Sequence, residues 1–283
     1  MTERDSPSQV NEAAADAVRD AARGGAPDRY LSALLAPRAV RGDLVALAAF
    51  SAEINRIASQ VREPHLGEIR VQWWRDALDA GSRGEKSGHP VADAFVETIK
   101  RHDLPTSRLE GYFDAHVHRL YGDPPADDAH LALELDLIEG TLFVLAAQIL
   151  GVQTTAEDPA IVHHAAQAYG LACIGLGLPQ SLARGRIPLP PSMIDENGGG
   201  APDDWRRAIK ALTVLAGKHL AHVTAAYSAE PRAIRTALLP VALVEPYLRA
   251  LSRPGHDPAH DIAEIAPLTR TWRLAKTHVA GRL

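Results

Sequence analysis

Histidine is the residue type whose spacing in this chain first suggests chemistry. Four histidines form two pairs with helical spacing, His219 with His222 and His256 with His260. Each pair would lie on one face of a helix. Zinc usually needs three or four protein ligands, and neither pair has an obvious third ligand in the sequence. The neighbours His163 and His164 are expected on different faces of their helix, so we expect no metal site.

A second group of residues has the charge to contact a phosphate or another ligand. Arg184 and Arg186 lie two residues apart, and guanidinium groups match phosphate geometry. The alternative for them is a salt bridge in a surface loop. Glu53 and Arg56 are one helical turn apart, which favours a simple ion pair. Glu139 lies in an apolar segment, where it either faces the core with a partner or points to solvent.

Nucleophilic catalysis and nucleotide binding find no support in the sequence. The single cysteine, Cys173, lies in an apolar stretch, and no Gly-x-Ser-x-Gly motif occurs. No Walker or dinucleotide-binding glycine motif occurs either. With one cysteine there is no internal disulfide, which indicates a reducing compartment.

The elements that would position these residues are helices. Apolar residues recur at steps of three and four in nine segments, namely 44–61, 68–80, 91–102, 109–120, 128–150, 159–178, 203–227, 234–251 and 267–279. Alternating β-branched runs are absent, and glycine and proline fall mostly between the segments. We therefore predict an all-α fold. Residues 1–27 are polar and are expected to form a flexible arm, with a loose helix over 11–23, ahead of a single helical domain over 28–283.

Composition excludes several classes of protein. The chain has 283 residues, 46% of them hydrophobic, and a net charge of −5, whereas a nucleic-acid-binding protein usually carries a basic excess. The longest apolar run, 140–150, is too short to span a bilayer. The first residues lack the apolar run of a signal peptide and the acid-poor character of a transit peptide. We expect a cytoplasmic bacterial protein, with peripheral contact at the inner face of the cytoplasmic membrane left open.

Three stretches together resemble the squalene/phytoene synthase family. They are Asp28–Leu31 with Arg41–Leu44 and Leu47–Phe50, then Arg70–Trp74, and finally Ala168–Gly170 with Ala183–Pro190. The string Arg-Gly-Arg-Ile-Pro-Leu-Pro is the most specific of these. The resemblance implies a helical bundle around a central cavity. Active members condense two allylic diphosphates head to head, and two helices each present an Asp-x-x-x-Asp box that holds magnesium.

Both aspartate boxes are degenerate in this sequence. Aligned on the preserved flanks, the first box places Asn55 and Ser59 where its aspartates belong. The second places Gly177 and Ser181 there, with Pro179 between them, and proline should disturb the helix at that point. Neutral side chains supply no charge to a magnesium cluster. We therefore expect no catalytic residue and no cofactor.

The resemblance is closer to a non-catalytic branch of the family, which contains the mitochondrial complex I assembly factor and its bacterial relatives. The shared features include Ala49-Phe50-x-x-Glu53, Glu139-Gly140-Thr141 and Pro179. The resemblance implies a protein partner in respiratory complex I assembly, and the cavity could still hold an isoprenoid or lipid. The alternative is an active prenyl synthase of the squalene/phytoene type with atypical magnesium ligands.

Two segments are candidates for a partner surface. One is the helix that contains Trp73 and Trp74, and the other is the segment from Asp28 to Leu35. An exposed tryptophan would suit a protein or membrane interface. For the two adjacent tryptophans, however, we favour burial of both rings.

Overall fold

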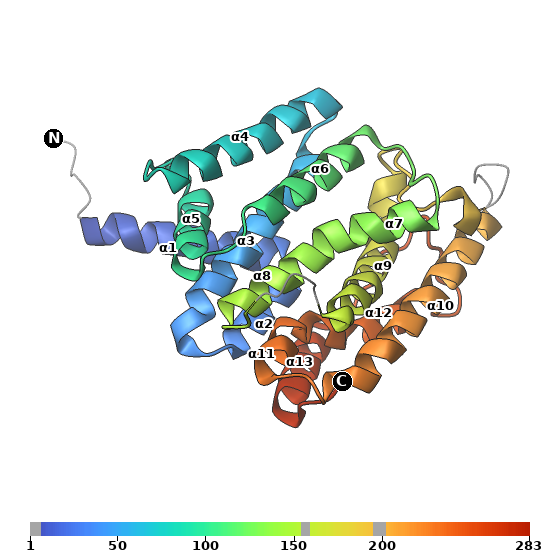
Figure 1. The fold of residues 1–283 in the computed structure, drawn as a ribbon. Coiled ribbons are helices and arrows are strands. Elements are labelled where there is room, and N and C mark those ends of the chain that lie inside the picture. Colours follow the sequence, from blue (N-terminus) through green and yellow to red (C-terminus); the bar gives the residue numbers. More distant parts are fainter. Residues whose placement is uncertain (1–6, 154–158, 195–201) are drawn as a thin grey trace. The chain divides into compact units, whose positions relative to one another are not determined.

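A computed structural model describes residues 7–153, 159–194 and 202–283 (Figure 1). Every regular element in these ranges is helical, which confirms the predicted all-α class. The elements are α1 (Pro7–Gly25), α2 (Pro27–Leu35), α3 (Arg38–Gln60), α4 (Pro64–Ser82), α5 (Pro90–His102), α6 (Ser107–Tyr121), α7 (Asp128–Leu135), the π-helix η1 (Asp136–Gly140), α8 (Thr141–Ile149), α9 (Ala160–Leu182), the 3-10 helix η2 (Pro191–Met193), α10 (Pro202–Tyr227), α11 (Arg232–Ala237), the 3-10 helix η3 (Leu239–Leu243), α12 (Val244–Leu251) and α13 (Pro267–Ala280).

Contacts between helices divide the chain into two compact units. The first covers Met1–Ser107 and the second Arg108–Leu283. The single domain expected over 28–283 stays a prediction, and each unit is described by itself below.

Helix α3 forms the centre of the first unit. Helices α1, α2, α4 and α5 all contact it. Phe50 of α3 is fully buried and stacks on Phe95 of α5 with ring centroids 4.2 Å apart, while Trp74 of α4 meets it edge-on at 5.5 Å. Aromatic pairs in these geometries add to the stabilisation from burial alone. This aromatic cluster joins three helices of the first unit.

Helix α1 differs from the flexible arm expected over residues 1–27. From Pro7 onward the segment is a helix that packs along α3, with Val18 and Ala22 buried. The close approach explains Gly25, because a Cβ there would lie 2.5 Å from the Cβ of Ala52. The short alanine and glycine side chains let the two backbones come together. The helix expected over 11–23 is therefore present, whereas the flexible arm was the wrong expectation for residues 7–25; residues 1–6 lie outside the described ranges.

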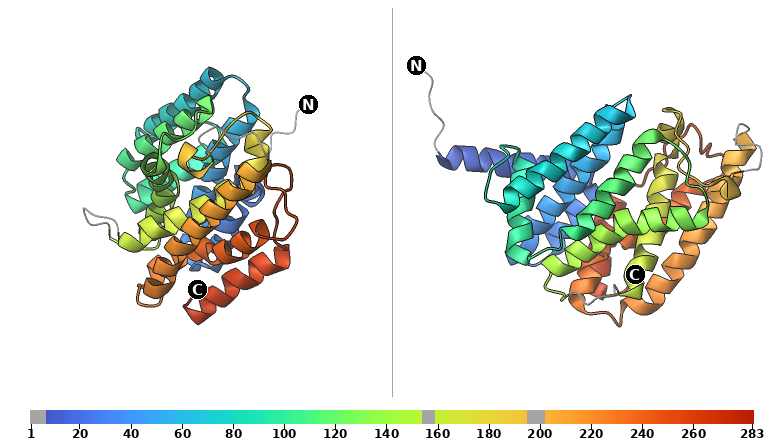
Figure 2. Two further views of the ribbon diagram at one scale, coloured as in Figure 1. Left: turned by 90° about the vertical axis from the view of Figure 1, so that its right-hand side faces the viewer. Right: turned by 45° about the horizontal axis from the view of Figure 1, so that its top comes forward.

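Helix α9 forms the centre of the second unit. Helix α10 runs alongside it in all views of Figures 1 and 2, and η1, α7, α8, α12 and η3 also contact it. Among the described residues, α9 is the one helix long and apolar enough to cross a membrane by length and composition. Two thirds of its apolar window, 67%, is buried within the protein. Its hydrophobicity is therefore accounted for by its central position in the unit.

The π-helix η1 lies against the middle of α9. A single π-helical turn inserts an extra residue into a helix, and such turns are frequent at functional sites. Gly170 of α9 makes the contact close, because a Cβ there would lie 2.6 Å from Leu135 and 3.3 Å from Glu139. Two of the stretches that carry the family resemblance, Ala168–Gly170 and Glu139–Thr141, are thus packing partners.

His116 of α6 should make the stability of the second unit depend on pH. Its side chain is buried, and its Nε2 makes no hydrogen bond with any residue that the structure describes. Burial, with a smaller contribution from the charge of Arg119, lowers the pKa of His116 to about 3. Because this value is below the ordinary 6.5, the folded state favours the neutral ring. The stability it contributes is present above pH 6.5 and is lost as the pH falls toward 3.

We expect the free energy of unfolding to fall by about 1.4 kcal/mol per pH unit below pH 6.5 through this residue. The measurement is urea unfolding of wild type and His116→Phe at several values between pH 7 and pH 5. The variant should lose less stability over this range, by about 2 kcal/mol. Exposed His118, on the same helix, provides the control His118→Gln, which should follow wild type. Parallel curves for wild type and His116→Phe would contradict the expectation.

Candidate functional site

The first degenerate box lies near the C-terminal end of α3. Asn55 and Ser59 are both exposed, one helical turn apart. The Ser59 hydroxyl donates to the backbone carbonyl of Arg56 at 2.7 Å, so it is engaged with its own helix. Glu53 and Arg56 form an ion pair, as the sequence predicted. The carboxylate of Glu53, next to the box, is therefore already paired with a positively charged side chain.

The second degenerate box lies in the last turns of α9. Gly177 and Ser181 are half-buried there. Pro179 was expected to disturb the helix, yet α9 continues through it to Leu182. Proline removes one backbone hydrogen bond and crowds the carbonyl four residues earlier, which here belongs to Gly175. The helix ends only three residues after Pro179, so few further bonds depend on it. None of the 23 residues of α9 is acidic.

The two arginines that follow α9 differ in their surroundings. Arg184 is exposed, and its Nη1 donates to the Gln180 carbonyl at 3.4 Å. Arg186 is half-buried, and its side chain lies over Gly122, where a Cβ would approach its Cγ to 3.0 Å. Gly122 has a positive φ of 78°, which also favours glycine. A phosphate contact by either arginine stays a prediction.

Glu139 was expected either to face the core or to point to solvent, and the structure shows an intermediate position. It is half-buried within η1, and its side chain reaches the α9 surface at Gly170. A ligand contact by Glu139 stays a prediction. The other acid of η1, Asp136, has polar partners on α9: His163 Nδ1 lies 2.8 Å from Oδ2, and Gln167 Nε2 donates to Oδ1 at 3.0 Å.

A histidine cluster forms where the start of α9 meets the later part of α10. His164 Nδ1 lies 3.0 Å from His219 Nδ1, and the rings of His163 and His164 are 5.2 Å apart. The ring of His222 stacks on that of His164 with centroids 4.4 Å apart. The expectation that His163 and His164 face apart is therefore wrong, since both rings reach His219.

The cluster is electrostatically unusual. Burial is the main cause that lowers the pKa of His219 to about 4, with further contributions from the other three histidines. Burial also lowers the pKa of His164, followed by the charges of His222 and His163. Asp136 acts in the opposite direction on both groups. The pairing of α9 with α10 brings these residues together from segments about fifty residues apart, which the sequence spacing did not reveal.

Asp43 was quoted from the sequence only for the family resemblance, and the structure gives it a buried role. It is 4% exposed and forms an ion pair with Arg101 of α5. His102 Nε2 lies 2.8 Å from Oδ2, and the Thr98 hydroxyl lies 3.4 Å from Oδ1. The polar network fastens α3 to α5. It gives this residue of the first signature stretch a structural role.

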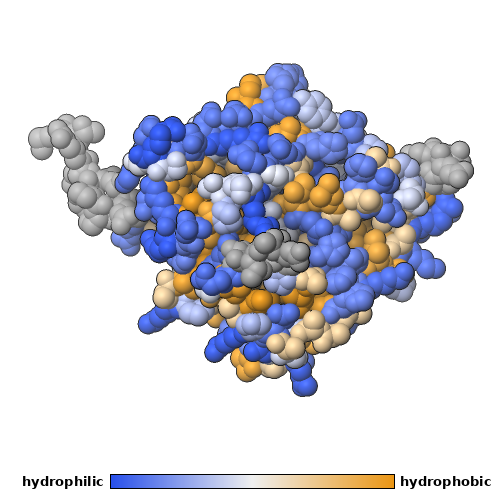
Figure 3. Space-filling view, viewed as in Figure 1, coloured by the Kyte–Doolittle hydropathy of each residue, from blue (hydrophilic) through white to orange (hydrophobic). Residues whose placement is uncertain are grey.

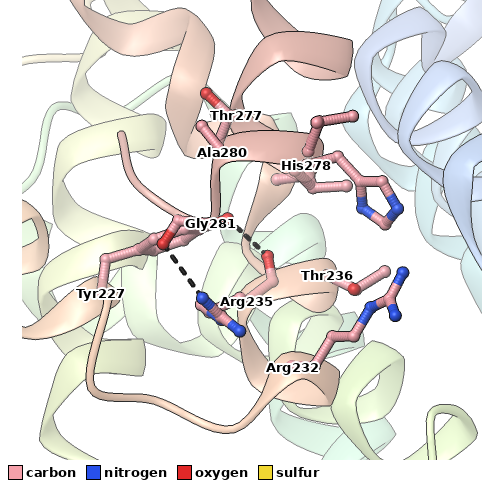
Figure 4. Close-up of a pocket in the computed structure, with 10 residues that line it drawn as sticks. Tyr227, Arg232, Arg235, Thr236, Thr277, His278, Ala280 and Gly281 are labelled. Atoms are coloured by element: carbon pink, nitrogen blue, oxygen red, sulfur yellow. Dashed lines mark hydrogen bonds between the residues drawn. The ribbon is translucent and has the colours of Figure 1, made fainter.

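The structure also has a cavity of about 510 Å³ among the C-terminal helices of the second unit (Figure 4). The Tyr227 hydroxyl donates to the Arg235 carbonyl at 2.7 Å, and Arg235 Nη1 donates to the Gly281 carbonyl at 3.1 Å. Burial raises the pKa of Tyr227 well above its ordinary value. None of the site residues predicted from the sequence lines this cavity.

The fold and the signature residues define the class of protein. The squalene/phytoene synthase family model matches residues 22–275, so the chain belongs to this family. Two solved structures share its fold at 16% identity: squalene synthase HpnC from Alicyclobacillus acidocaldarius, with a TM-score of 0.68 over 98% of this chain and 97% of that one, and a dehydrosqualene synthase, with a TM-score of 0.76 over 97% and 98%.

Curated relatives carry a different kind of name. The chain is 25% identical over 261 residues to the rat protein "NADH dehydrogenase (ubiquinone) complex I, assembly factor 6", covering 87% of this chain and 78% of that protein. The human protein of the same name is 25% identical over 239 residues, covering 82% and 72%. A mouse protein with this name is 24% identical over 261 residues, covering 87% and 78%.

Proposed function

We propose that this protein is a non-catalytic member of the squalene/phytoene synthase family that acts in the assembly of respiratory complex I. The observation that carries the proposal is the loss of acid at both box positions, Asn55 with Ser59 and Gly177 with Ser181, on helices that otherwise keep the family signature. The name shared by the mammalian relatives supports the assembly role.

The residues at the two boxes do not fit magnesium. Magnesium is a hard cation that binds carboxylate and other oxygen ligands in near-octahedral geometry. Helix α9 offers no carboxylate, and both carboxylates of α3 are held in ion pairs, Asp43 with Arg101 and Glu53 with Arg56. A diphosphate leaving group needs preorganised positive charge, and these boxes have no ligands to hold it. We therefore derive no prenyl-transfer step for this chain.

An assembly factor must present a surface to its partner, and α4 has one. Leu66, Ile69 and Trp73 are 46%, 63% and 41% exposed, and their spacing places them on one stripe of the helix. Trp74, the neighbouring residue, is buried, so burial of both tryptophans was the wrong expectation. The face shown in Figure 3 is mainly hydrophilic with separate apolar patches. We propose that the protein is cytoplasmic. The α4 stripe would then contact a protein partner or the inner face of the cytoplasmic membrane.

The test is a deletion strain in which assembled complex I is measured by native gel with in-gel NADH dehydrogenase activity. Deletion should lower assembled complex I, and the wild-type gene should restore it. Leu66→Ser with Ile69→Ser should restore less assembled complex I, because it removes apolar surface proposed to contact the partner. Both side chains are exposed, so the substitutions should leave the core intact. The matched control, Leu133→Ser with Val214→Ser, replaces two other exposed apolar residues, 57% and 53% exposed, and should restore fully.

Two outcomes would count against the proposal in different ways. Unchanged complex I in the deletion strain would remove the assembly role. Full restoration by the α4 variant would keep the role and remove the α4 stripe as the partner surface.

A further inference from the structure

Three histidines of the second unit converge from two helices. His163 and His164 belong to α9, and His219 belongs to α10. One ring nitrogen of each lies within 4.8 Å of the ligand nitrogens of the other two. Imidazole nitrogen is a common ligand for zinc, copper and nickel, and a set of three such ligands is the usual basis of a zinc site with an open position.

The distances suit an ion with short metal–nitrogen bonds. Zinc binds imidazole nitrogen at about 2.0–2.1 Å, so two ligands of a tetrahedral ion lie roughly 3.3 Å apart. His164 Nδ1 and His219 Nδ1 are 3.0 Å apart and face each other. Two identical nitrogen atoms at this distance must share a proton, and a metal ion would replace that proton. The ligand atom of His163 lies within 4.8 Å of both, so this third nitrogen must approach to complete the set.

Asp136 and Gln167 form a second layer behind His163. Asp136 contacts His163 Nδ1 at 2.8 Å, which leaves Nε2 of that ring available for a metal. Gln167 is 3% exposed and donates both to Asp136 at 3.0 Å and to the Ala132 carbonyl at 2.8 Å. A carboxylate that orients a metal-binding histidine is a common feature of zinc sites. This layer distinguishes the cluster from a chance group of surface histidines.

The site is open on one side. His163 is exposed, while His164 and His219 are half-buried. The ligands project from two long helices that pack along each other, and such elements hold ligand geometry better than loops do. His222 stacks on His164 and supports its ring. Water can complete the coordination from the exposed side.

We propose that His163, His164 and His219 bind one divalent transition-metal ion of the zinc class, with Asp136 as the residue that orients His163. The site is independent of the degenerate aspartate boxes, which would hold a hard cation. It is also independent of the assembly role, and its test does not depend on complex I.

The test uses the full chain, freed of any affinity tag and stripped of metal, titrated with Zn²⁺ by calorimetry and with Co²⁺ by visible absorption. We expect one ion per chain and the d–d bands of tetrahedral cobalt. His164→Gln and His219→Gln should each weaken binding by tenfold or more. Asp136→Asn should weaken it by about 10–100-fold, as loss of an orienting partner does in other sites. Circular dichroism checks that each variant is folded.

The matched control replaces two exposed histidines outside the cluster, His65→Gln with His118→Gln, and should bind as wild type does. Absence of stoichiometric binding by the wild-type chain would overturn the proposal. So would equal affinity for wild type and the variant His164→Gln with His219→Gln, since binding would then occur elsewhere among the thirteen histidines.

Discussion

Phe50→Ala should lower the free energy of unfolding by about 4 kcal/mol, the largest effect that we expect from a single substitution. Phe50 is fully buried, stacks on Phe95 at 4.2 Å and meets Trp74 at 5.5 Å. Its removal would lose the transfer free energy of the ring and the aromatic contacts, and it would leave a cavity that adds a further cost. Denaturant unfolding followed by circular dichroism measures the change.

The control for this prediction is Ile69→Ala on α4. Ile69 is 63% exposed, so its truncation should change stability by no more than about 0.5 kcal/mol. If Phe50→Ala cost no more than Ile69→Ala, the three-helix aromatic cluster would not be the core of the first unit.

Asp43→Ala should cost about 2 kcal/mol of stability, because it removes a buried carboxylate and leaves its less exposed hydrogen-bond partners unpaired. Asp43 is 4% exposed, and its loss leaves the His102 ring, 15% exposed, without its carboxylate partner, whereas Arg101 is exposed to solvent. The same denaturant assay measures the effect, and a thermal melt should show a parallel fall in Tm.

Asp79→Ala is the matched control for Asp43→Ala. Asp79 also pairs with an arginine, Arg83, but both side chains are exposed to solvent. Exposed ion pairs contribute little, so this variant should melt as wild type does. Equal effects of the two substitutions would show that the Asp43 network is no stronger than a surface pair.

Phe50 and Asp43, unlike the two control residues, belong to the stretches that carry the family resemblance. Phe50 and Asp43 hold helices together, and Gly170 allows η1 to approach α9. A signature built from packing residues can persist when the metal ligands are lost. This separation explains how the chain keeps the family fold while Asn55, Ser59 and their counterparts on α9 carry no charge.

The fold class could be predicted from the sequence because the helical periodicity is strong and local. The ion pair of Glu53 with Arg56 was also predictable, since both lie on one helix. A helix was expected within residues 1–27, but its packing on α3 was not, because that packing depends on the tertiary contact of Gly25 with Ala52.

The histidine cluster could not be predicted from spacing alone. His164 and His219 are separated by fifty-five residues and meet only because α9 pairs with α10. Adjacent residues on a helix direct their Cβ atoms to different sides. The imidazole rings of His163 and His164 nevertheless extend far enough for both to reach His219 on α10. The effect of Pro179 was misjudged because α9 ends only three residues after it, so few helical hydrogen bonds depend on that turn.

A turnover assay with the purified protein would show directly whether this chain catalyses prenyl transfer. Farnesyl diphosphate and geranylgeranyl diphosphate would each be incubated with Mg²⁺, and extracted hydrocarbon and prenyl products would be quantified against a heat-denatured sample. We predict no product above that background, because losing a single preorganised charge contact commonly costs about 10²–10³-fold in rate and here both boxes are neutral. Magnesium-dependent product that disappears in Arg184→Ala with Arg186→Ala would rule out a non-catalytic protein and identify an active prenyl synthase.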